Sequence, residues 1–526
     1  MELSRSRLQT IIYRHGIWIL PGFIAQLMVI IPYLNTHPYP ALGGGLYQYM
    51  AYTISQNHYL LPTRIPHYTK GGIPFAYPPL ILYGIAVLQD LGVRPLTLAR
   101  LGSAISPFLY LPGIYFFTYE LRETRFEAGF ATAIVAVSPI MFRLHLSAGG
   151  IVRSTAFLFT VAGLYTGLHV FRDSNSHWVL PASMLFGLAL LSHALYATFF
   201  GISYVLFWLY FRPTVNGLRD GVLVASGGII LAAPWWATVV FRHGFQVYLG
   251  ATNSQHLFSS GPLLSIVLNT TLFSAVTEPA LLVDPWVGTL LVATGLLLLA
   301  EKWFLPVWLL GVDLLLAHPR WSKFIGILVL VAGFSQAMTL ISNRLTASTP
   351  RRSRMVSAGI ALLVMSHILF IGMGYARGTP RDQSSSLHMF LDNEDMAAME
   401  WVATETRSNA SFLVVGSTAE WFPQQTDRTI LIAIWGTEWS GGKKFNRQSQ
   451  IFRQLAYCSN ASCLTDVRSN IDSRTDFVYV PKGRYSTIYS GRRTMPDTMQ
   501  RSLEASSQYE IVFENDGVII VEVNTN

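Results

Sequence analysis

Long apolar segments alternate with short polar connections through the first 376 residues of the chain. Many of them approach or exceed the roughly 18 consecutive apolar residues that a membrane-spanning helix requires. They lie at about 16–34, 98–119, 126–142, 154–171, 178–192, 194–211, 219–241, 284–300, 303–317, 323–342 and 355–375. The pattern predicts a polytopic α-helical membrane protein with about eleven spans, and at most about thirteen.

One apolar piece, residues 78–91, is short for a span and begins with Pro78 and Pro79. We expect it to form a helix that lies in the membrane interface. It belongs to a polar and aromatic first outer loop, residues 35–97, and a second long outer loop covers residues 242–283.

Basic residues indicate the orientation of the spans. Arg5, Arg7 and Arg14 precede the first run, and the N-terminus shows no short apolar segment with a small-residue cleavage site. An uncleaved first span with a cytoplasmic N-terminus is therefore expected. The inner connections then carry Arg122, Arg125, Arg172, Arg212, Arg219, Lys302, Arg344, Arg351, Arg352 and Arg354. The last span exits on the outer side, so we expect a multi-pass protein of the cytoplasmic membrane whose residues 377–526 are extracytoplasmic.

Residues 377–526 have a different pattern. Asn393 can cap a helix whose apolar residues recur at helical spacing. Strand-like runs follow at 412–415, 429–434, 477–480, 509–513 and 518–523, and helical stretches lie near 446–457 and 494–506. Residues 515–517, Asn-Asp-Gly, separate the last two strands as a hairpin turn does. A small extracytoplasmic α/β domain is predicted after the transmembrane domain, residues 1–376.

Composition agrees with a protein that is solvated mainly by lipid. Of the 526 residues, 51% are hydrophobic and 13% are charged, and the mean hydropathy is +0.38, whereas soluble domains carry about 25% charged residues. The net charge of +8 does not indicate nucleic-acid binding, because the basic residues mostly occupy short connections between apolar runs.

The chain has two cysteines, Cys458 and Cys463. No histidine accompanies them at zinc-site spacing, so a structural zinc site is not expected. A local disulfide is expected if this part lies outside the cytosol, and two free thiols are the alternative.

Short motifs in the loops and in the C-terminal part resemble those of the GT-C superfamily of membrane glycosyltransferases. This superfamily includes protein O-mannosyltransferases, the aminoarabinose transferase for lipid A and oligosaccharyltransferase subunits. The motifs are residues 38–51 (PYPALGGGLYQYMA), 70–80 (KGGIPFAYPPL), 147–153 (SAGGIVR), 191–196 (LSHALY), 233–236 (APWW), 242–244 (RHG), 318–320 (HPR), 420–423 (EWFP) and 436–439 (GTEW).

The resemblance implies transfer of a sugar from a polyprenyl-phosphate donor to an acceptor outside the cytoplasm, which can be a glycan, a lipid or a protein. It also implies that an acidic residue of the first outer loop serves as base or as ligand of a divalent cation. Membrane lipids are expected partners and nucleic acid is not.

This sequence departs from that pattern, because no Asp or Glu occurs between Asn35 and Tyr77 or between Arg143 and Arg153. The resemblance places the expected acid at residues 43–45, which are three glycines here. A bound divalent cation is therefore doubtful, because its expected carboxylate ligand is absent from the first loop. Glu278 and Asp284 flank a later outer loop where some family members place an acid. They are the candidate catalytic residues, together with His193, whose imidazole could replace the base.

Basic and aromatic residues provide candidate binding groups. Lys70, Arg100, Arg153 and Arg320 lie near span ends on the outer side and could hold the donor phosphate, or could contact lipid headgroups. Tyr47 and Tyr77 could stack on sugar rings or belong to an interfacial aromatic belt, and Glu420 and Trp421 could contact the acceptor.

Two functions follow. The first is transfer of a lipid-linked sugar on the outer face. The second is that of a catalytically silent relative that binds lipid-linked glycan or partner proteins, which the acid-free first loop suggests. A transporter is disfavoured because few charged residues fall within the spans.

Overall fold

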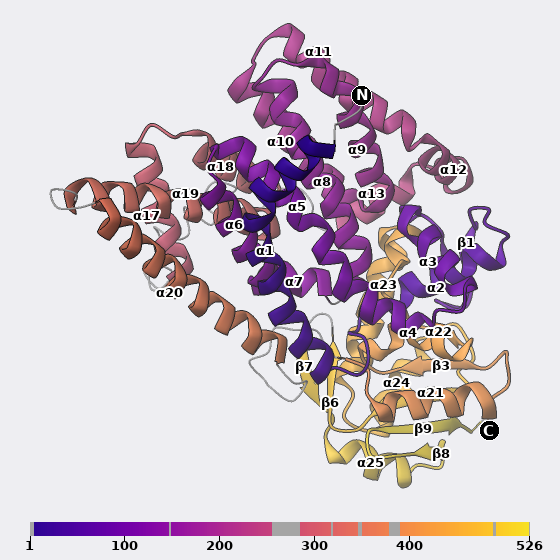
Figure 1. Cartoon of the computed structure of the whole chain (residues 1–526). Helices are drawn as coiled ribbons and strands as arrows, with labels where there is room; N and C mark the ends of the chain where they lie inside the picture. The colour runs from indigo at the N-terminus through magenta and orange to yellow at the C-terminus, as the bar shows by residue number, and fades with distance from the viewer. Residues whose placement is uncertain are drawn as a thin grey trace.

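The computed structural model describes residues 5–146, 149–254, 285–316, 319–345, 350–377, 390–487 and 491–524. A helical part occupies residues up to 377, and a part with a mixed sheet follows from residue 390 (Figure 1). The prediction of a helical membrane protein with a C-terminal α/β region is confirmed at this level. The extent of the two domains, 1–376 and 377–526, remains a prediction.

The helical part begins with a long helix and the elements of the first loop. These are α1 (Arg5–Thr36), α2 (Gly45–Gln56), β1 (Arg64–Ile65), β2 (Ile73–Pro74), α3 (Leu80–Asp90), α4 (Pro95–Thr97) and the π-helical η1 (Leu98–Gly102). The remaining helices are α5 (Ser103–Arg122), α6 (Arg125–Val137), α7 (Pro139–Leu146), α8 (Gly150–Phe171), η2 (Ser176–Trp178), α9 (Val179–Ser192), α10 (Ala194–Phe211), α11 (Val215–Leu231), α12 (Ala233–His243), α13 (Gln246–Ser254), α17 (Pro285–Leu299), α18 (Phe304–Leu316), α19 (Pro319–Leu345) and α20 (Pro350–Arg377).

Five helices of the described ranges are long and apolar enough to cross a membrane, and a sixth span results if the pair α11 and α12 counts as one. The five cover Arg14–Thr36, Pro95–Arg122, Gly150–Phe171, Ala194–Phe211 and Arg320–Ile341. Shorter apolar helices occupy Leu80–Asp90, Ser176–Ser192, Gly288–Leu299, Phe304–Leu316 and Ala358–Gly374. The number of about eleven spans therefore remains a prediction, whereas multiple membrane passes are supported.

Two apolar runs that the sequence presents as continuous are broken helices. The run 126–142 is divided between α6 and α7, where Ser138 is extended and Pro139 begins the next helix. The run 219–241 bends by 63° between α11 and α12. Pro234 lies in the first turn of α12, where its missing N–H and its ring interrupt a straight helix.

The C-terminal region contains a five-stranded sheet in the order β4-β3-β5-β9-β8. Strand β3 (Ser411–Val414) pairs in parallel with β4 (Thr429–Ile430) and β5 (Phe477–Pro481). Strand β9 (Val518–Val523) is antiparallel to β5 and to β8 (Tyr509–Glu514). The β8–β9 hairpin is confirmed, and its turn is held by Asn515, whose Oδ1 accepts from the backbone N–H groups of Gly517 and Val518.

The other elements of this region surround the sheet. They are α21 (Asn393–Glu405), η3 (Ser417–Glu420), α22 (Phe422–Thr426), η4 (Thr437–Ser440), α23 (Gly442–Tyr457), α24 (Ala461–Ser469), α25 (Asp497–Glu504) and a separate hairpin of β6 (Arg484–Thr487) and β7 (Gly491–Thr494). The predicted cap at Asn393 is wrong by one residue: the cap is Asp392, whose carboxylate accepts from the N–H of Asp395 at 2.8 Å. The strand predicted at 429–434 ends at Ile430, because the following segment turns toward α23 and its Ala433 N–H is bonded by Gln448.

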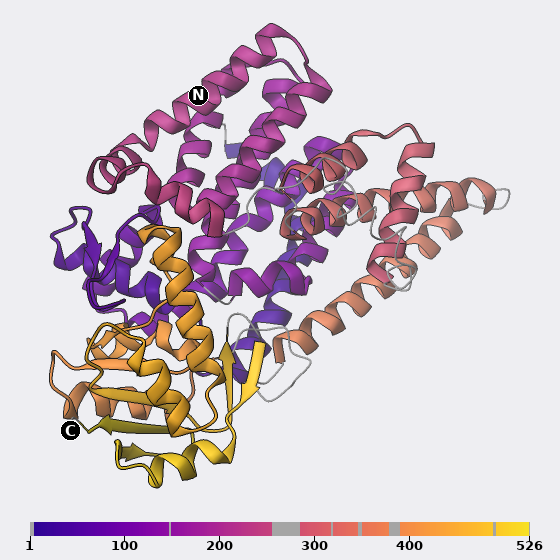
Figure 2. The ribbon, with the colours of Figure 1, turned by 180° about the vertical axis from the view of Figure 1, so that it is seen from behind.

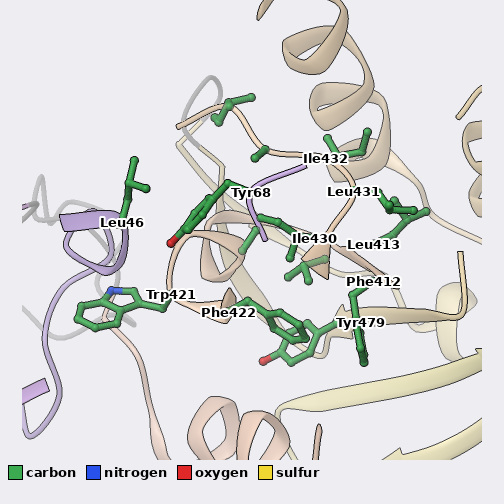
Figure 3. Packing of buried hydrophobic residues seen from close by; sticks show 14 of the residues in the cluster. Leu46, Tyr68, Phe412, Leu413, Trp421, Phe422, Ile430, Leu431, Ile432 and Tyr479 are labelled. Atoms are coloured by element: carbon green, nitrogen blue, oxygen red, sulfur yellow. The ribbon is translucent and has the colours of Figure 1, made fainter. Parts of the chain in front are cut away.

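The first loop and the sheet part lie side by side in both views (Figures 1 and 2). The N–H of Thr69 donates to the carbonyl of Ile430 at 2.9 Å, and the N–H of Ile430 donates to that of His67 at 3.0 Å. The loop thus extends the sheet beyond its edge strand β4 through the parallel bridge Tyr68–Ile430. Figure 3 shows Leu46 and Tyr68 packed with Trp421 and neighbouring residues of the sheet part. The two segments therefore share one hydrophobic core.

Candidate functional site

The three glycines at residues 43–45 lie against residues of the C-terminal region. A Cβ atom at Gly45, the first residue of α2, would lie 2.6 Å from the carbonyl oxygen of Glu420 and from the Cα of Trp421. The indole Nε1 of Trp421 donates to the carbonyl of Ala41 at 3.2 Å. Only glycine, which has no side chain, leaves room for the backbone of residues 420–421 at this distance. The glycines therefore allow the C-terminal region to contact the loop closely.

Glu420 therefore lies beside the loop segment in which the expected acid is missing. It ends η3, is only 2% exposed, and its Oε2 has no hydrogen-bond partner among the described residues. Burial raises the pKa of Glu420 to about 8, although the backbone N–H groups of Gly43 and Leu46 and the guanidinium of Arg153 favour its charged form. The backbone of Glu420 is held by the hydroxyl of Tyr68, which donates to its carbonyl oxygen.

Arg153 and Arg320 lie in the first turns of two long helices, α8 and α19. Arg153 is half-buried and Arg320 is 8% exposed. They are close enough for their charges to repel, and Arg320 also hydrogen-bonds the hydroxyl of Tyr196. Helix N-termini carry partial positive charge. Two guanidinium groups at two helix starts therefore form a strongly positive, partly desolvated region, which suits an anion.

Aromatic side chains surround this positive region. The guanidinium of Arg320 lies 5.3 Å from the ring centroid of Tyr196 and 5.5 Å from that of Trp321. The hydroxyl of Tyr196 lies 2.9 Å from the Nε2 of the buried His145, whose Nδ1 lies 3.1 Å from the hydroxyl of Tyr110. The chain thus contains a relay of polar groups, from His145 through Tyr196 to Arg320, within an aromatic surround.

Tyr47 and Tyr77 connect the positive region to the first loop. Their rings meet edge to face with centroids 5.0 Å apart, and Tyr77 lies 5.9 Å from the ring of His193. Tyr47 lies against Gly149, which has a positive φ of 73° and where a Cβ would be 2.1 Å from the tyrosine ring. Both tyrosines lie near Arg153.

Other predicted site residues have different surroundings. Arg100 donates to the carbonyls of Leu34 at 2.6 Å and His37 at 2.7 Å, so it completes the C-terminal end of α1. His193 caps α10, because its Nδ1 accepts from the N–H of Leu195 at 3.3 Å. Lys70 is exposed and lines an open cleft of the first loop together with Arg64 and other residues. His193 also adjoins the arginine pair, because its ring lies 5.2 Å from that of Tyr196, whereas Arg100 and Lys70 make other contacts.

Glu278 and Asp284 lie outside the described residues. Cys458 and Cys463 form a disulfide. Among the described residues, one group of side chains could hold a metal ion, namely Glu120, His169 and Asp173. It lies at the end of α8 opposite to Arg153, and Arg172 already pairs with both of its carboxylates.

The sequence does not single out His145, and it indicates Glu420 only as a possible contact of the acceptor. His145 lies just after the apolar run 126–142, between Arg143 and Arg153, and no motif spacing in the sequence marks it. The proximity of Glu420 to residues 43–45 has no signal in the sequence, because it depends on packing between segments more than 370 positions apart.

No protein-family profile matches the chain, and no curated protein matches it in sequence. Solved structures match over most of its length. The oligosaccharyltransferase of Archaeoglobus fulgidus tethered to an acceptor peptide gives a TM-score of 0.55 at 14% identity and covers 88% of this chain and 69% of its own. ArnT of Cupriavidus metallidurans bound to undecaprenyl phosphate gives 0.53 at 12% identity, with 96% and 98% covered. The mycobacterial arabinofuranosyltransferase AftD gives 0.58 at 16% identity, with 96% and 40% covered.

The chain therefore has the fold of the GT-C membrane glycosyltransferases, as its motifs suggested. It spans less than half of AftD but nearly the whole of ArnT. At these identities the likeness concerns the fold.

Proposed function

We propose that this protein transfers a sugar from a polyprenyl-phosphate-linked donor to an acceptor outside the cytoplasm. The observation that carries the proposal is the pair Arg153 and Arg320, which start α8 and α19 beside Tyr47 and Tyr77 of the first loop. Such a pair suits the phosphate of a lipid-linked sugar, because a planar guanidinium group can bind phosphate in a bidentate manner, with two parallel N–H···O hydrogen bonds.

The same pair suits the chemistry. When the bond between the sugar and the phosphate breaks, negative charge accumulates on the lipid phosphate. Fixed positive groups in a partly desolvated site stabilise that charge more than they stabilise the bound donor. Structural relatives agree with the ligand class, since ArnT has been solved with undecaprenyl phosphate and the Archaeoglobus enzyme with a dolichol-phosphate and an inhibitory peptide.

Charge distribution supports the expected orientation. The helix ends opposite to Arg153 carry ion pairs in which arginine is frequent, such as Arg122–Glu127 at 2.6 Å and Arg212–Asp220 at 2.9 Å. We infer that these ends face the cytoplasm, that residues 377–526 are extracytoplasmic, and that the site lies on the outer face. The Cys458–Cys463 disulfide supports this orientation, because such bonds persist outside the cytosol.

The alternative is a silent relative that binds lipid-linked glycan without transfer. The specific observation in its favour is the first loop, in which residues 35–77 contain no Asp or Glu.

The test uses the purified full-length chain in nanodiscs. Binding of polyprenyl phosphate is measured for the native protein and for Arg153→Ala, Arg320→Ala and the exposed control Arg94→Ala. We expect each of the two site variants to weaken binding about 10- to 100-fold, as loss of a charge-assisted hydrogen bond does, and the control to bind normally. A panel of polyprenyl-phosphate sugars and hydroxyl acceptors then measures transfer.

Absence of binding in the native protein, or equal binding by all variants, would overturn the proposal. Binding without transfer to any acceptor would instead support the silent relative.

A further inference from the structure

The missing acid of the first loop has a spatial replacement. The segment at residues 43–45 offers backbone only, and Glu420 of the C-terminal region meets it from the other side. A loop acid at position 45 and the present placement of Glu420 exclude one another, because a Cβ at Gly45 would lie 2.6 Å from the Glu420 carbonyl oxygen. The Glu420 carboxyl group accepts from the backbone N–H groups of Gly43 and Leu46, so the chain has a carboxyl group next to the loop segment that has none.

The surroundings of this carboxyl group are those of a functional group rather than of an ordinary ion pair. Glu420 is buried, its Oε2 has no hydrogen-bond partner among the described residues, and the arginine that interacts with it is Arg153 of the phosphate site. A buried carboxyl oxygen without a partner is costly, and a catalytic role is one reason for a protein to retain such a group. The charge of Arg153 also acts on this carboxyl group, which relates the carboxyl group to the proposed phosphate site.

We propose that Glu420 is the catalytic base of the reaction, contributed by the C-terminal region in place of a first-loop acid. This inference rests on the proposed function. The hydroxyl oxygen of the acceptor attacks the anomeric carbon of the donor sugar, and its proton passes to Oε2 of Glu420. The bond between the anomeric carbon and the phosphate oxygen breaks, and its electron pair leaves with the lipid phosphate, whose charge Arg153 and Arg320 balance. No further reactant is needed.

The backbone around Glu420 fixes its position for this role. The hydroxyl of Tyr68 holds the Glu420 carbonyl, and the indole of Trp421 is anchored to Ala41. Because Tyr68 is also bridged to Ile430, the loop and the sheet together hold the backbone that carries Glu420. A base held in this way needs no rearrangement of its own backbone during the reaction.

The experiment compares Glu420→Gln, Glu420→Ala and the control Asp395→Asn in the nanodisc transfer assay. Asp395 is a suitable control because it is also a carboxyl group of raised pKa, about 7, in the same region, and its hydroxyl partner is Tyr479 of the sheet. We expect Glu420→Gln to lower the transfer rate about 10²- to 10⁴-fold and to change polyprenyl-phosphate binding less than about 3-fold. We expect Asp395→Asn to transfer normally.

A role in positioning alone is separated by chemical rescue. Glu420→Ala leaves space for a small acid, so formate should restore part of its transfer rate and should not affect Glu420→Gln. Transfer by Glu420→Gln within about 3-fold of the native rate would overturn the assignment. Parallel loss of binding and transfer without formate rescue would also overturn it, in favour of a docking role. Failure of the native protein to bind donor would refute the proposed function instead, and donor binding without transfer would refute both.

Discussion

Replacement of Glu420 by glutamine removes a titratable group from a buried position while keeping its size and shape. Burial raises the pKa of this carboxyl group from 4.5 to about 8. Because the folded-state value exceeds the unfolded value, the native protein binds more protons than the unfolded chain between these two pH values. Stability is therefore lost as the pH rises from about 4.5 to about 8.

The size of this effect follows from the shift. A difference of about 3.5 in pKa corresponds to about 5 kcal/mol between low and high pH, with a slope of about 1.4 kcal/mol per pH unit inside the window. Glutamine mimics the protonated acid and carries no such penalty. We expect Glu420→Gln to match the native protein near pH 5 and to exceed its stability increasingly toward pH 9.

The assay is thermal unfolding of the purified chain from pH 5 to pH 9, followed by tryptophan fluorescence. Asp395→Asn provides a matched control, because the pKa of Asp395 is raised from 3.8 to about 7 and its effect is complete at a lower pH. Between pH 7.5 and pH 8.5 the control should run parallel to the native protein, whereas Glu420→Gln should diverge from it.

Parallel curves for Glu420→Gln and the native protein over the whole range would refute the reasoning. Lower stability of Glu420→Gln at high pH would also refute it, because Gly43, Leu46 and Arg153 would then stabilise a permanently charged carboxylate.

Three further predictions concern contacts within the C-terminal region and between it and the first loop. Gly45→Ala should destabilise the protein by about 1–3 kcal/mol through overpacking against Glu420, and a thermal shift would measure this; unchanged stability would mean that the contact is loose. Arg428→Ala should cost about 2–4 kcal/mol, because this buried guanidinium donates to carbonyls at the end of α21, and Arg428→Lys should recover little of that loss in the same unfolding assay. Cys458→Ser should cost about 2 kcal/mol by loss of the short Cys458–Cys463 loop constraint, and a reductant that lowers the stability of the native protein should leave this variant unchanged.

Some of this fold could be predicted from local patterns. The hairpin of β8 and β9 follows from alternating apolar residues around Asn515, and the long helices α1 and α8 follow from continuous apolar runs. The breaks at Ser138 and near Pro234 lie beside prolines, but a proline alone does not predict a break, because α1 and α5 continue through prolines of their own. Packing decides whether such a run bends, and packing is not visible in a local window.

For the candidate site, the sequence indicates some of the residues but not how they come together. Arg153 and Arg320 could be selected because a charged residue at the end of an apolar run is conspicuous in the sequence. Their proximity, and that of Tyr196 and His145, depends on how four helices pack. The meeting of Glu420 with residues 43–45 depends on contacts across almost the whole chain.

The bridge between Tyr68 and Ile430 has a consequence for how the protein is made and how it can change. During synthesis the first loop emerges more than 350 residues before the strand that it joins, so its side of the sheet stays unpaired until the last part of the chain has been delivered. For the same reason, exchange of the C-terminal region with that of a distant relative should fail unless the first loop is exchanged with it. The loop and the sheet are far apart in the sequence, but substitutions in one must remain compatible with the other.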